Sequence, residues 1–227
     1  MPILNGPSRQ PYAGGAPDSL GILLHGLGAD GNDLIGLTIA LGPRFPHMAF
    51  HSPDAPNPYV EAGFGLRWFP LEPPDERMAG LREAGRIVET YVGELLEQYA
   101  LTPDRCVLIG FSQGCMTSLY TAPRMERPIA GVVGLSGSLL FPEWLADEVR
   151  QKPPIVLVHG DQDAVLPPES TAKAGQTLAD LGFPVEAYLL QGLGHSIDIR
   201  GLEIASQFIE RVLAPPDGAE QSEPPTS

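Results

Sequence analysis

The sequence predicts an α/β fold whose mostly parallel sheet is covered by helices on both faces. Short apolar runs, often β-branched and bounded by Gly or Pro, recur along the chain and are typical of buried strands. These runs are 20–25, 48–52, 105–110, 129–136, 154–160 and 185–192. Helical patterns fill several of the gaps, and strands that alternate with helices favour parallel pairing.

The clearest helix is expected over 76–100, where apolar side chains form one stripe and charged side chains occupy the other face. Further helices are expected near 30–42, 112–124, 168–182 and 196–213. The 227 residues contain no internal repeat and no splitting linker, so 1–214 is predicted to form one domain. The segment 215–227 is Pro-rich and acidic, and we predict that it is disordered because it cannot bury a core.

Charge and composition exclude several classes of partner. The net charge is −14, from 28 acidic and 14 basic residues, whereas nucleic acids and anionic membranes are bound by basic surfaces. Neither a signal peptide nor an apolar run of about 18 residues is visible, so we expect a cytoplasmic protein without a transmembrane segment. The two cysteines, Cys106 and Cys115, show neither a metal-site spacing nor a disulfide framework, and we expect buried thiols.

The stretch GFSQG places Ser112 between a predicted strand and a predicted helix. This arrangement is typical of a nucleophile elbow, a strained turn that holds a serine hydroxyl above the N-terminus of the following helix. Strand and helix approach each other closely there, so the positions two before and two after the serine must be small. Gly110 and Gly114 occupy these positions, and the sequence therefore predicts that Ser112 is a nucleophile.

A nucleophilic serine needs a general base, which is expected on a loop after a later strand. His195 follows the last predicted strand and is predicted to be this base. His25 and His159 each end a strand and precede a glycine, which indicates structural hydrogen bonds. His47 and His51 lie far upstream, around the second predicted strand.

The base in turn needs a carboxylate that orients it. Asp161 and Asp163 both follow the predicted strand 154–160. Asp163 reaches further into the loop and is predicted to be the acid, whereas Asp161 is well placed to cap the turn. Asp161 stays open as the alternative.

Backbone N–H groups are expected to bind the negative charge that develops on the acyl oxygen, in an oxyanion hole. One expected donor is the N–H of Gln113, the residue after the nucleophile. The other should come from the loop HGLGADGNDL, in which three glycines within six residues let the backbone fold tightly beside the serine. We predict Leu27 as this second donor.

Two apolar segments are predicted to bind the substrate beside the serine. One is the aromatic-rich loop 53–74, and the other is SGSLLFPEW, which follows the strand ending at Leu135. Both follow strands and should lie at the edge of the sheet where ligands bind. The expected lining residues are Phe64, Leu66, Trp68, Phe69, Leu139, Leu140, Phe141 and Leu166.

Six motifs occur in the order LLHGLGADGNDL, PDAP, RWFPL, GFSQG, HGDQDAVLP and GLGHSI. With them the sequence resembles the phospholipase/carboxylesterase family of α/β-hydrolases, which includes the acyl-protein thioesterases. The resemblance extends from about Asp18 to Leu213. It implies a minimal α/β-hydrolase fold without a large cap domain. Because only about nineteen residues precede the run 20–25, we expect the sheet to be truncated at that edge.

The resemblance also implies the same site residues that the motifs indicate. It assigns Ser112, Asp163 and His195 to the catalytic triad, and the amides of Leu27 and Gln113 to the oxyanion hole.

The expected function is that of a serine carboxylesterase that hydrolyses short- to medium-chain carboxylic esters through an acyl-enzyme. Thioesters and lysophospholipids are further substrate classes for the same chemistry, which needs no metal and no organic cofactor. Two alternatives stay open: a non-catalytic binding module with the same fold, and a peptidase or acyltransferase with the same triad. The expected partner is a small-molecule ester or thioester, and the sequence leaves a homodimer open.

Overall fold

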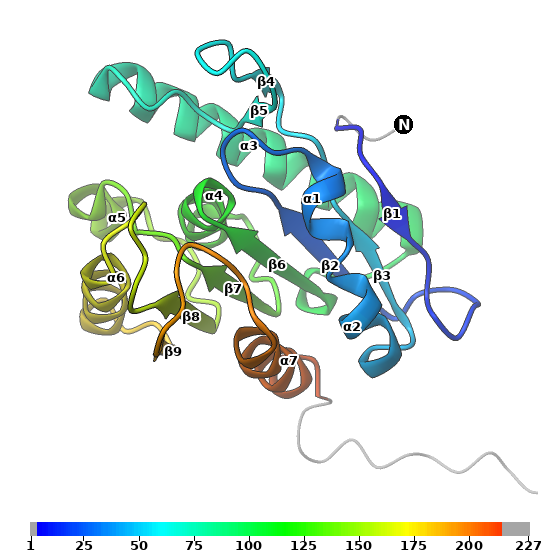
Figure 1. The fold of residues 1–227 in the computed structure, drawn as a ribbon. Coiled ribbons are helices and arrows are strands. Elements are labelled where there is room, and N and C mark those ends of the chain that lie inside the picture. Colours follow the sequence, from blue (N-terminus) through cyan, green and yellow to red (C-terminus); the bar gives the residue numbers. More distant parts are fainter. Residues whose placement is uncertain (1–3, 215–227) are drawn as a thin grey trace, which may run out of the picture.

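The computed structural model describes residues 4–214 and contains a seven-stranded sheet with the order β1-β3-β2-β6-β7-β8-β9 (Figure 1). The strands are β1 (Ser8–Arg9), β2 (Ser19–Leu24), β3 (Met48–His51), β6 (Cys106–Phe111), β7 (Gly131–Leu135), β8 (Ile155–Gly160) and β9 (Val185–Leu190). Neighbouring strands pair in parallel, except that β1 runs antiparallel to β3. The mostly parallel sheet that the sequence predicts is confirmed.

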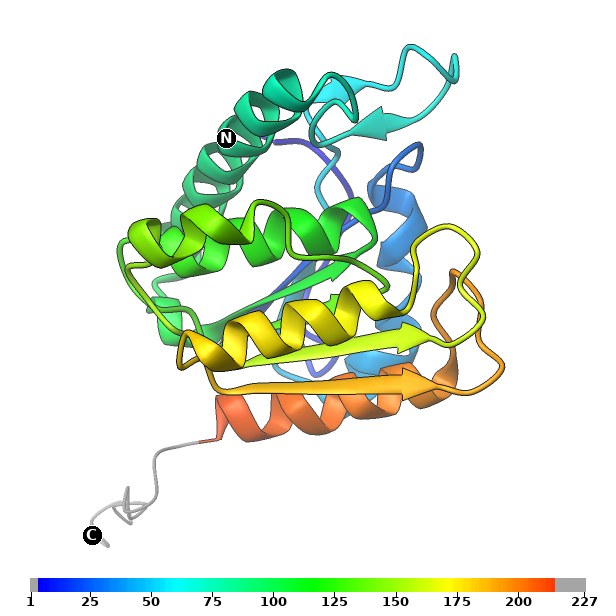
Figure 2. The same ribbon diagram turned by 90° about the vertical axis from the view of Figure 1, so that its left-hand side faces the viewer.

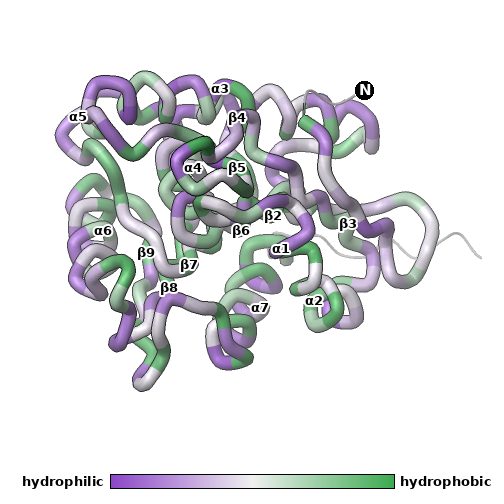
Figure 3. Tube along the Cα trace, turned by 45° about the horizontal axis from the view of Figure 1, so that its top comes forward, coloured by the Kyte–Doolittle hydropathy of each residue, from purple (hydrophilic) through white to green (hydrophobic). Residues whose placement is uncertain are grey.

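Helices cover both faces of the sheet, as predicted (Figures 1 and 2). One face carries α3 (Pro74–Tyr99), α4 (Gln113–Thr121), α5 (Pro142–Glu148) and α6 (Glu169–Asp180). The other face carries α1 (Gly31–Ile35), α2 (Thr38–Arg44) and α7 (Ile199–Leu213). In Figure 3, α3, α6 and α7 alternate between hydrophilic and hydrophobic stretches, as expected for helices with one buried face.

The inner strands β2, β3, β6, β7 and β8 are buried on both sides, which explains why their sequences are apolar runs instead of alternating patterns. The edge strand β9 is largely exposed. In β2, Ile22 and Leu24 join the core under α3 and α4, whereas Leu23 joins the core under α7. In β6, Leu108 joins the core under α3 and α4, and Ile109 joins the core on the opposite face. This division follows from the two-residue period of a strand.

The order of the strands determines where a ligand site can form. From β2 the chain moves to β3 at one side, and it returns to β6 on the other side of β2. In open α/β sheets, ligands bind at the carboxyl ends of the strands where the order reverses in this way. The loop after β2 and the turn after β6 are the segments that carry Leu27 and Ser112.

The structure differs from the sequence-based expectation in three segments. The helix expected over 30–42 is divided into α1 and α2, because Leu37 donates its backbone N–H to Leu34 in a tight turn between them. The loop 53–74 contains a hairpin of β4 (Asn57–Pro58) and β5 (Leu66–Arg67), which projects from the body in Figure 2. Helix α5 is a helix that the sequence patterns do not predict.

The edges of the fold agree with the expected minimal architecture. At the N-terminal edge, the sheet ends with the two-residue strand β1. Residues 4–214 insert no cap domain between the strands, and no helix in this range combines the length and the apolar character needed to cross a membrane. The segment 215–227, predicted to be disordered, lies outside the described residues.

Candidate active site

The turn between β6 and α4 holds Ser112 in a strained backbone conformation. Its φ is 52° and its ψ is −114°, a region that residues with a side chain rarely adopt. The elbow also brings the strand and helix backbones together. A Cβ atom on Gly114 would collide with the carbonyl of Leu24, and one on Gly110 would collide with the backbone of Gly114. The chain therefore needs glycine at both positions.

The three residues predicted as a triad come together at the carboxyl ends of β6, β8 and β9. Ser112 Oγ lies 3.0 Å from Nε2 of His195, and Nδ1 of His195 lies 2.6 Å from Oδ2 of Asp163. A carboxylate only accepts hydrogen bonds, so the proton of the imidazole resides on Nδ1. Nε2 is then free to accept the proton of the serine hydroxyl. Phe111 packs against the imidazole, with ring centroids 4.9 Å apart.

The carboxylate of Asp163 is buried and held by several donors. Oδ1 accepts hydrogen bonds of 2.8 and 2.9 Å from the backbone N–H groups of Val165 and Leu166. Burial alone would raise the pKa of Asp163, but the hydrogen bonds from Leu166, His195 and Val165 outweigh it and lower the pKa below its usual value. The carboxylate therefore stays ionised beside the imidazole.

Asp161, the alternative acid, occupies a different place in the same loop. Its Oδ1 accepts a 2.6 Å hydrogen bond from the backbone N–H of Gly192, which follows β9. The side chain thus joins the two loops that carry Asp163 and His195. The sequence indicates a cap on the turn after β8 for Asp161, and the structure instead shows a bridge between two loops.

His25 has the structural role that the sequence indicates. Its Nε2 accepts a 3.0 Å hydrogen bond from the N–H of Ala55, so Nδ1 carries the proton and donates it to the carbonyl of Gly26 at 2.7 Å. The imidazole thereby fixes the start of the loop that contains Leu27.

Both predicted oxyanion donors have N–H groups that the fold leaves available. Gln113 is the first residue of α4, where a backbone N–H has no partner within the helix. In the loop after β2, Gly28 donates to Leu66 and Ala29 donates to the carbonyl of Gly26. None of the backbone hydrogen bonds found within residues 4–214 uses the N–H of Leu27.

A short segment, 66–69, connects the two parts of this predicted oxyanion hole. The side chain of Gln113 accepts a hydrogen bond from Trp68 N–H and donates one to the carbonyl of Phe69, both at 2.8 Å. The indole Nε1 of Trp68 donates to the carbonyl of His25 at 2.9 Å. Leu66 forms backbone hydrogen bonds with Gly28 and Ala29. Sequence reasoning missed this role of Gln113, because nothing in the sequence indicates the partner of a buried amide.

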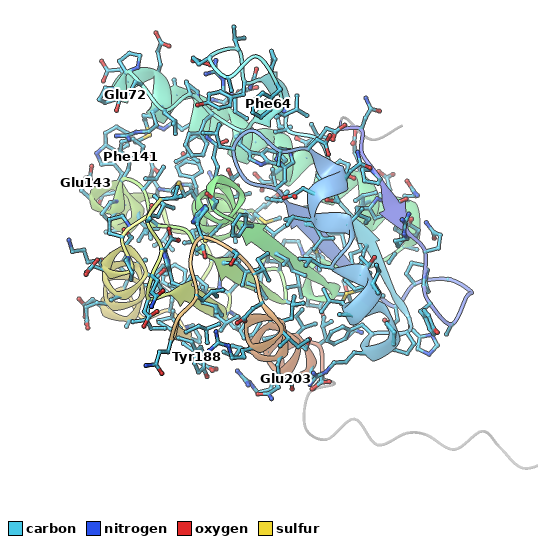
Figure 4. All side chains as sticks on the ribbon, in the orientation of Figure 1. Phe64, Glu72, Phe141, Glu143, Tyr188 and Glu203 are labelled. Atoms are coloured by element: carbon cyan, nitrogen blue, oxygen red, sulfur yellow. The ribbon has the colours of Figure 1, made fainter. Side chains whose placement is uncertain are left out.

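Two of the predicted substrate-binding residues are wrong. Trp68 and Phe69 are 0% exposed, and their rings are enclosed in the core, so they present no surface to a ligand. Phe64 is 71% exposed on the hairpin, and Figure 4 shows it apart from Phe141, which lies beside α5. The remaining predicted residues share partial burial against the same core; they are Leu66, Leu139, Leu140, Phe141 and Leu166.

A pocket of about 480 Å³ lies between α3, α4 and α5, away from the triad, and no residue of the triad lines it. Four arginines contribute to its wall, namely Arg82, Arg86, Arg124 and Arg150. Arg82 and Arg124 both form ion pairs with Glu148, so one carboxylate is shared by two of these arginines. The residues that the structure describes contain no cluster of three or more His, Cys, Asp or Glu side chains suited to a metal ion.

A strained serine turn at the switch point of a parallel sheet, followed in the chain by an acid and a histidine, is the arrangement of α/β-hydrolases. The chain has this fold. Residues 14–213 match the family model described as Phospholipase/Carboxylesterase, and the chain therefore belongs to the phospholipase/carboxylesterase family.

Relatives in sequence and in structure agree with this assignment. Acyl-protein thioesterase 1 homolog 1 of Dictyostelium discoideum is 29% identical over 202 residues, which cover 85% of this chain and 89% of the relative. The crystal structure of esterase PE8 is similar with a TM-score of 0.87 and 38% identity, over 92% of this chain and 99% of that one. Acyl-protein thioesterase 2 of Zea mays, at 23% identity and a TM-score of 0.75 over 92% and 100% of the two chains, shows the fold alone. The chain is thus a hydrolase by family.

Proposed function

We propose that the protein is a serine carboxylesterase that hydrolyses short- to medium-chain carboxylic esters through a covalent acyl-enzyme. Thioesters and lysophospholipids are related substrates for the same chemistry. The observation that carries the proposal is the continuous path from Ser112 Oγ through His195 to Asp163, with distances of 3.0 and 2.6 Å. Relatives named as an esterase and as acyl-protein thioesterases support this substrate class.

In the acylation step, the hydroxyl oxygen of Ser112 attacks the acyl carbon while Nε2 of His195 takes the hydroxyl proton. Asp163 holds the imidazole in the tautomer with the proton on Nδ1 and stabilises the imidazolium that forms. The N–H groups of Leu27 and Gln113 bind the tetrahedral oxyanion, each worth about 3 kcal/mol in comparable sites. His195 then protonates the leaving group, and the C–O or C–S bond breaks.

In the deacylation step, a water molecule takes the place of the leaving group. His195 accepts a proton from the water as it attacks the acyl carbon of the Ser112 ester. The tetrahedral intermediate collapses, the serine oxygen recovers its proton from His195, and the carboxylic acid leaves. Every proton transfer uses the single imidazole, so the mechanism needs no further acid or base.

The preference for short to medium acyl chains follows from the surface around the serine. The described residues form no cap that would enclose a long chain. Five apolar side chains that are partly buried against the core are proposed to line a shallow trough beside the serine; they are Leu66, Leu139, Leu140, Phe141 and Leu166. Each methylene buried in such a trough contributes about 0.8 kcal/mol.

A fluorophosphonate probe tests the proposal directly, because it labels only an activated serine. We expect covalent labelling of folded protein and its loss in Ser112→Ala. Ser206→Ala is the matched control, since Ser206 lies on α7 and donates to the carbonyl of Leu202. Absence of labelling in folded protein would favour a non-catalytic binding module.

A competition between water and other acyl acceptors separates the esterase from the second alternative. With p-nitrophenyl butyrate as acyl donor, we expect free butyrate as the main product in the presence of alcohols or amines. Predominant transfer to the added acceptor would identify an acyltransferase, and faster cleavage of matched anilides than of esters would identify a peptidase.

A further inference from the structure

We propose that His159 is a positioning residue for the pair of Asp163 and His195, a role that rests on the function proposed above. His159 lies in β8 and is 0% exposed. Its Nε2 lies 3.0 Å from Oδ2 of Asp163, and this is the same oxygen that lies 2.6 Å from Nδ1 of His195. One carboxylate oxygen is thus shared by two histidines.

The neighbours of His159 determine which of its ring nitrogens carries the proton. Nε2 also lies 3.1 Å from the carbonyl oxygen of Leu166, to which it is hydrogen-bonded. A carbonyl and a carboxylate only accept hydrogen bonds, so Nε2 must be a donor. The proton on Nε2 therefore lies between two oxygen atoms of the loop that contains Asp163.

A hydroxyl group holds the other ring nitrogen. Nδ1 of His159 lies 2.6 Å from Oγ1 of Thr171, in the first turn of α6. Since Nδ1 carries a lone pair in this tautomer, the hydroxyl of Thr171 donates to it. The alternative acceptor for the same hydroxyl, the carbonyl of Gly137, is 3.4 Å away and is the poorer partner. Thr171 thus maintains the tautomer of His159 that faces Asp163.

This arrangement fixes the carboxylate from both of its oxygens. Val165 and Leu166 donate to Oδ1, while His195 donates to Oδ2 and the N–H dipole of His159 lies against the same oxygen. A carboxylate with additional donors attracts a neighbouring proton less strongly. His159 therefore restricts rotation of the Asp163 carboxylate. It also reduces the extent to which this carboxylate stabilises the imidazolium form of His195.

The cost of burying an imidazole supports a role beyond packing. The other side chains of β8, from Ile155 to Val158, are apolar and buried. An imidazole among them requires partners for both ring nitrogens, whereas an aliphatic residue would require none. The partners of His159 lie in the loop that presents Asp163 and in the helix that follows it.

The other charged groups near the pair are engaged elsewhere. Asp161 accepts the hydrogen bond from Gly192, in the loop before His195. Asp198, after His195, caps α7 through Gly201 and pairs with Arg200. Among the described residues, two titratable side chains lie within hydrogen-bonding distance of the carboxylate of Asp163. These are His195 and His159.

The first test measures the pH dependence of kcat/KM for His159→Phe, which removes the polar contacts of both ring nitrogens and keeps a ring. We expect kcat to fall about tenfold with little change in KM, and the acid limb of the profile to move up by about half a pH unit. His159→Gln retains an N–H donor near the position of Nε2, so the acid limb of its pH profile should return to the wild-type position. His51→Phe is the control, because His51 is another buried histidine, bonded to Tyr99 instead.

A second variant covers the case in which His159→Phe does not fold. Thr171→Val has nearly the same shape and removes only the hydroxyl, so its acid limb should move in the same direction by a smaller amount. Suppose instead that the acid limb of the pH profile stays at the wild-type position in folded His159→Phe or Thr171→Val, and that activity falls only in proportion to the amount of folded protein. His159 would then merely support the loop. That result would overturn the proposal.

A measurement without turnover separates this inference from the proposed function. In ¹⁵N NMR spectra, His159 should show a protonated Nε2 and an unprotonated Nδ1, assigned by the loss of its signals in His159→Phe. A proton on Nδ1 in place of Nε2 would overturn the inference while leaving the esterase proposal intact. Conversely, wild-type protein that fails to react with a fluorophosphonate would negate the proposed function, whatever the tautomer.

Discussion

The side-chain oxygen of Gln113 accepts a 2.8 Å hydrogen bond from the backbone N–H of Trp68, 45 residues earlier in the chain. Through its amide nitrogen, Gln113 also binds the carbonyl of Phe69. The segment 66–69 is in turn bonded to the loop after β2. The two backbone groups proposed to bind the oxyanion, from Leu27 and Gln113, are therefore held at a fixed separation by one segment.

Replacement of Gln113 by leucine should weaken oxyanion binding more than substrate binding. Gln113→Leu leaves a buried N–H and a buried carbonyl unpaired, which costs about 2–4 kcal/mol in stability. We expect kcat to fall about tenfold at nearly constant KM, and a boronic acid, which mimics the tetrahedral state, to bind about tenfold more weakly. Gln176→Leu is the control, since this exposed glutamine is hydrogen-bonded to Asp180 in the same helix. Wild-type affinity for the boronic acid in folded Gln113→Leu would contradict this account.

Trp68→Ala should reduce stability and affect all esters alike, because the indole is buried and binds the carbonyl of His25. The loss should be about 3–5 kcal/mol, the range for truncation of a large buried ring. Urea unfolding gives the stability, and the ratio of kcat/KM for butyrate and acetate esters gives the selectivity. Phe64→Ala, on the exposed hairpin, should change stability by less than about 0.5 kcal/mol. A selective loss of the longer ester in Trp68→Ala would restore the interpretation of Trp68 as a wall of the trough.

The two aspartates after β8 should respond very differently to the same substitution. Asp163→Asn disturbs the tautomer of His195 and should lower kcat by about four orders of magnitude. Asp161→Asn keeps an oxygen that can accept the hydrogen bond from Gly192, so activity should stay within a few-fold of wild type. Steady-state kinetics with one ester is sufficient for the comparison. A greater loss in Asp161→Asn would reverse the assignment of the acid.

The sequence predicts those features that depend on neighbouring residues. Strands that are buried on both faces give continuous apolar runs, and the sequence predicts β2, β3, β6, β7 and β8 from such runs. The edge strand β9 is largely exposed, but its sequence VEAYLL is still apolar enough to be predicted. The turn at Ser112 needs glycine two positions away on each side, a requirement that is local and therefore visible in the sequence. The chain order of Ser112, Asp163 and His195 follows from the order of the strands.

The sequence does not predict features that depend on contacts between distant segments. The burial of Trp68 depends on His25 and Gln113, and no local pattern distinguishes it from an aromatic residue that lines a trough. The contact of His159 with Asp163 spans only four residues, but it requires the loop to fold back onto β8. Without this contact in view, His159 is simply a histidine at the end of a strand.

Leu140 offers a test of the trough, because it is only partly buried and packs against the core next to Phe141. With wild-type protein, kcat/KM should rise severalfold for each carbon added to the acyl chain until the trough ends, since each methylene contributes about 0.8 kcal/mol. Leu140→Ala should flatten this rise and leave acetyl esters nearly unaffected. Leu189→Ala, at an exposed position of β9, is the control. Equal losses for acetyl and longer esters would exclude Leu140 from the trough.

The buried His51 should make the stability of the protein depend on pH. Burial lowers the pKa of His51 to about 4, whereas the unfolded chain has a histidine pKa of about 6.5. Between these values the unfolded state binds a proton that the folded state does not, so stability is complete above about pH 6.5 and falls as the pH decreases towards 4. The full difference corresponds to about 3 kcal/mol.

Urea unfolding at about pH 7.5 and about pH 5 measures this dependence. His51→Phe removes the titrating group, so the variant should lose less stability than wild type between the two pH values. Burial also lowers the pKa of His25, but His25 is present in both proteins and its contribution cancels in the comparison. Equal losses in wild type and His51→Phe would mean that His51 is not kept neutral by burial beside Tyr91 and Tyr99.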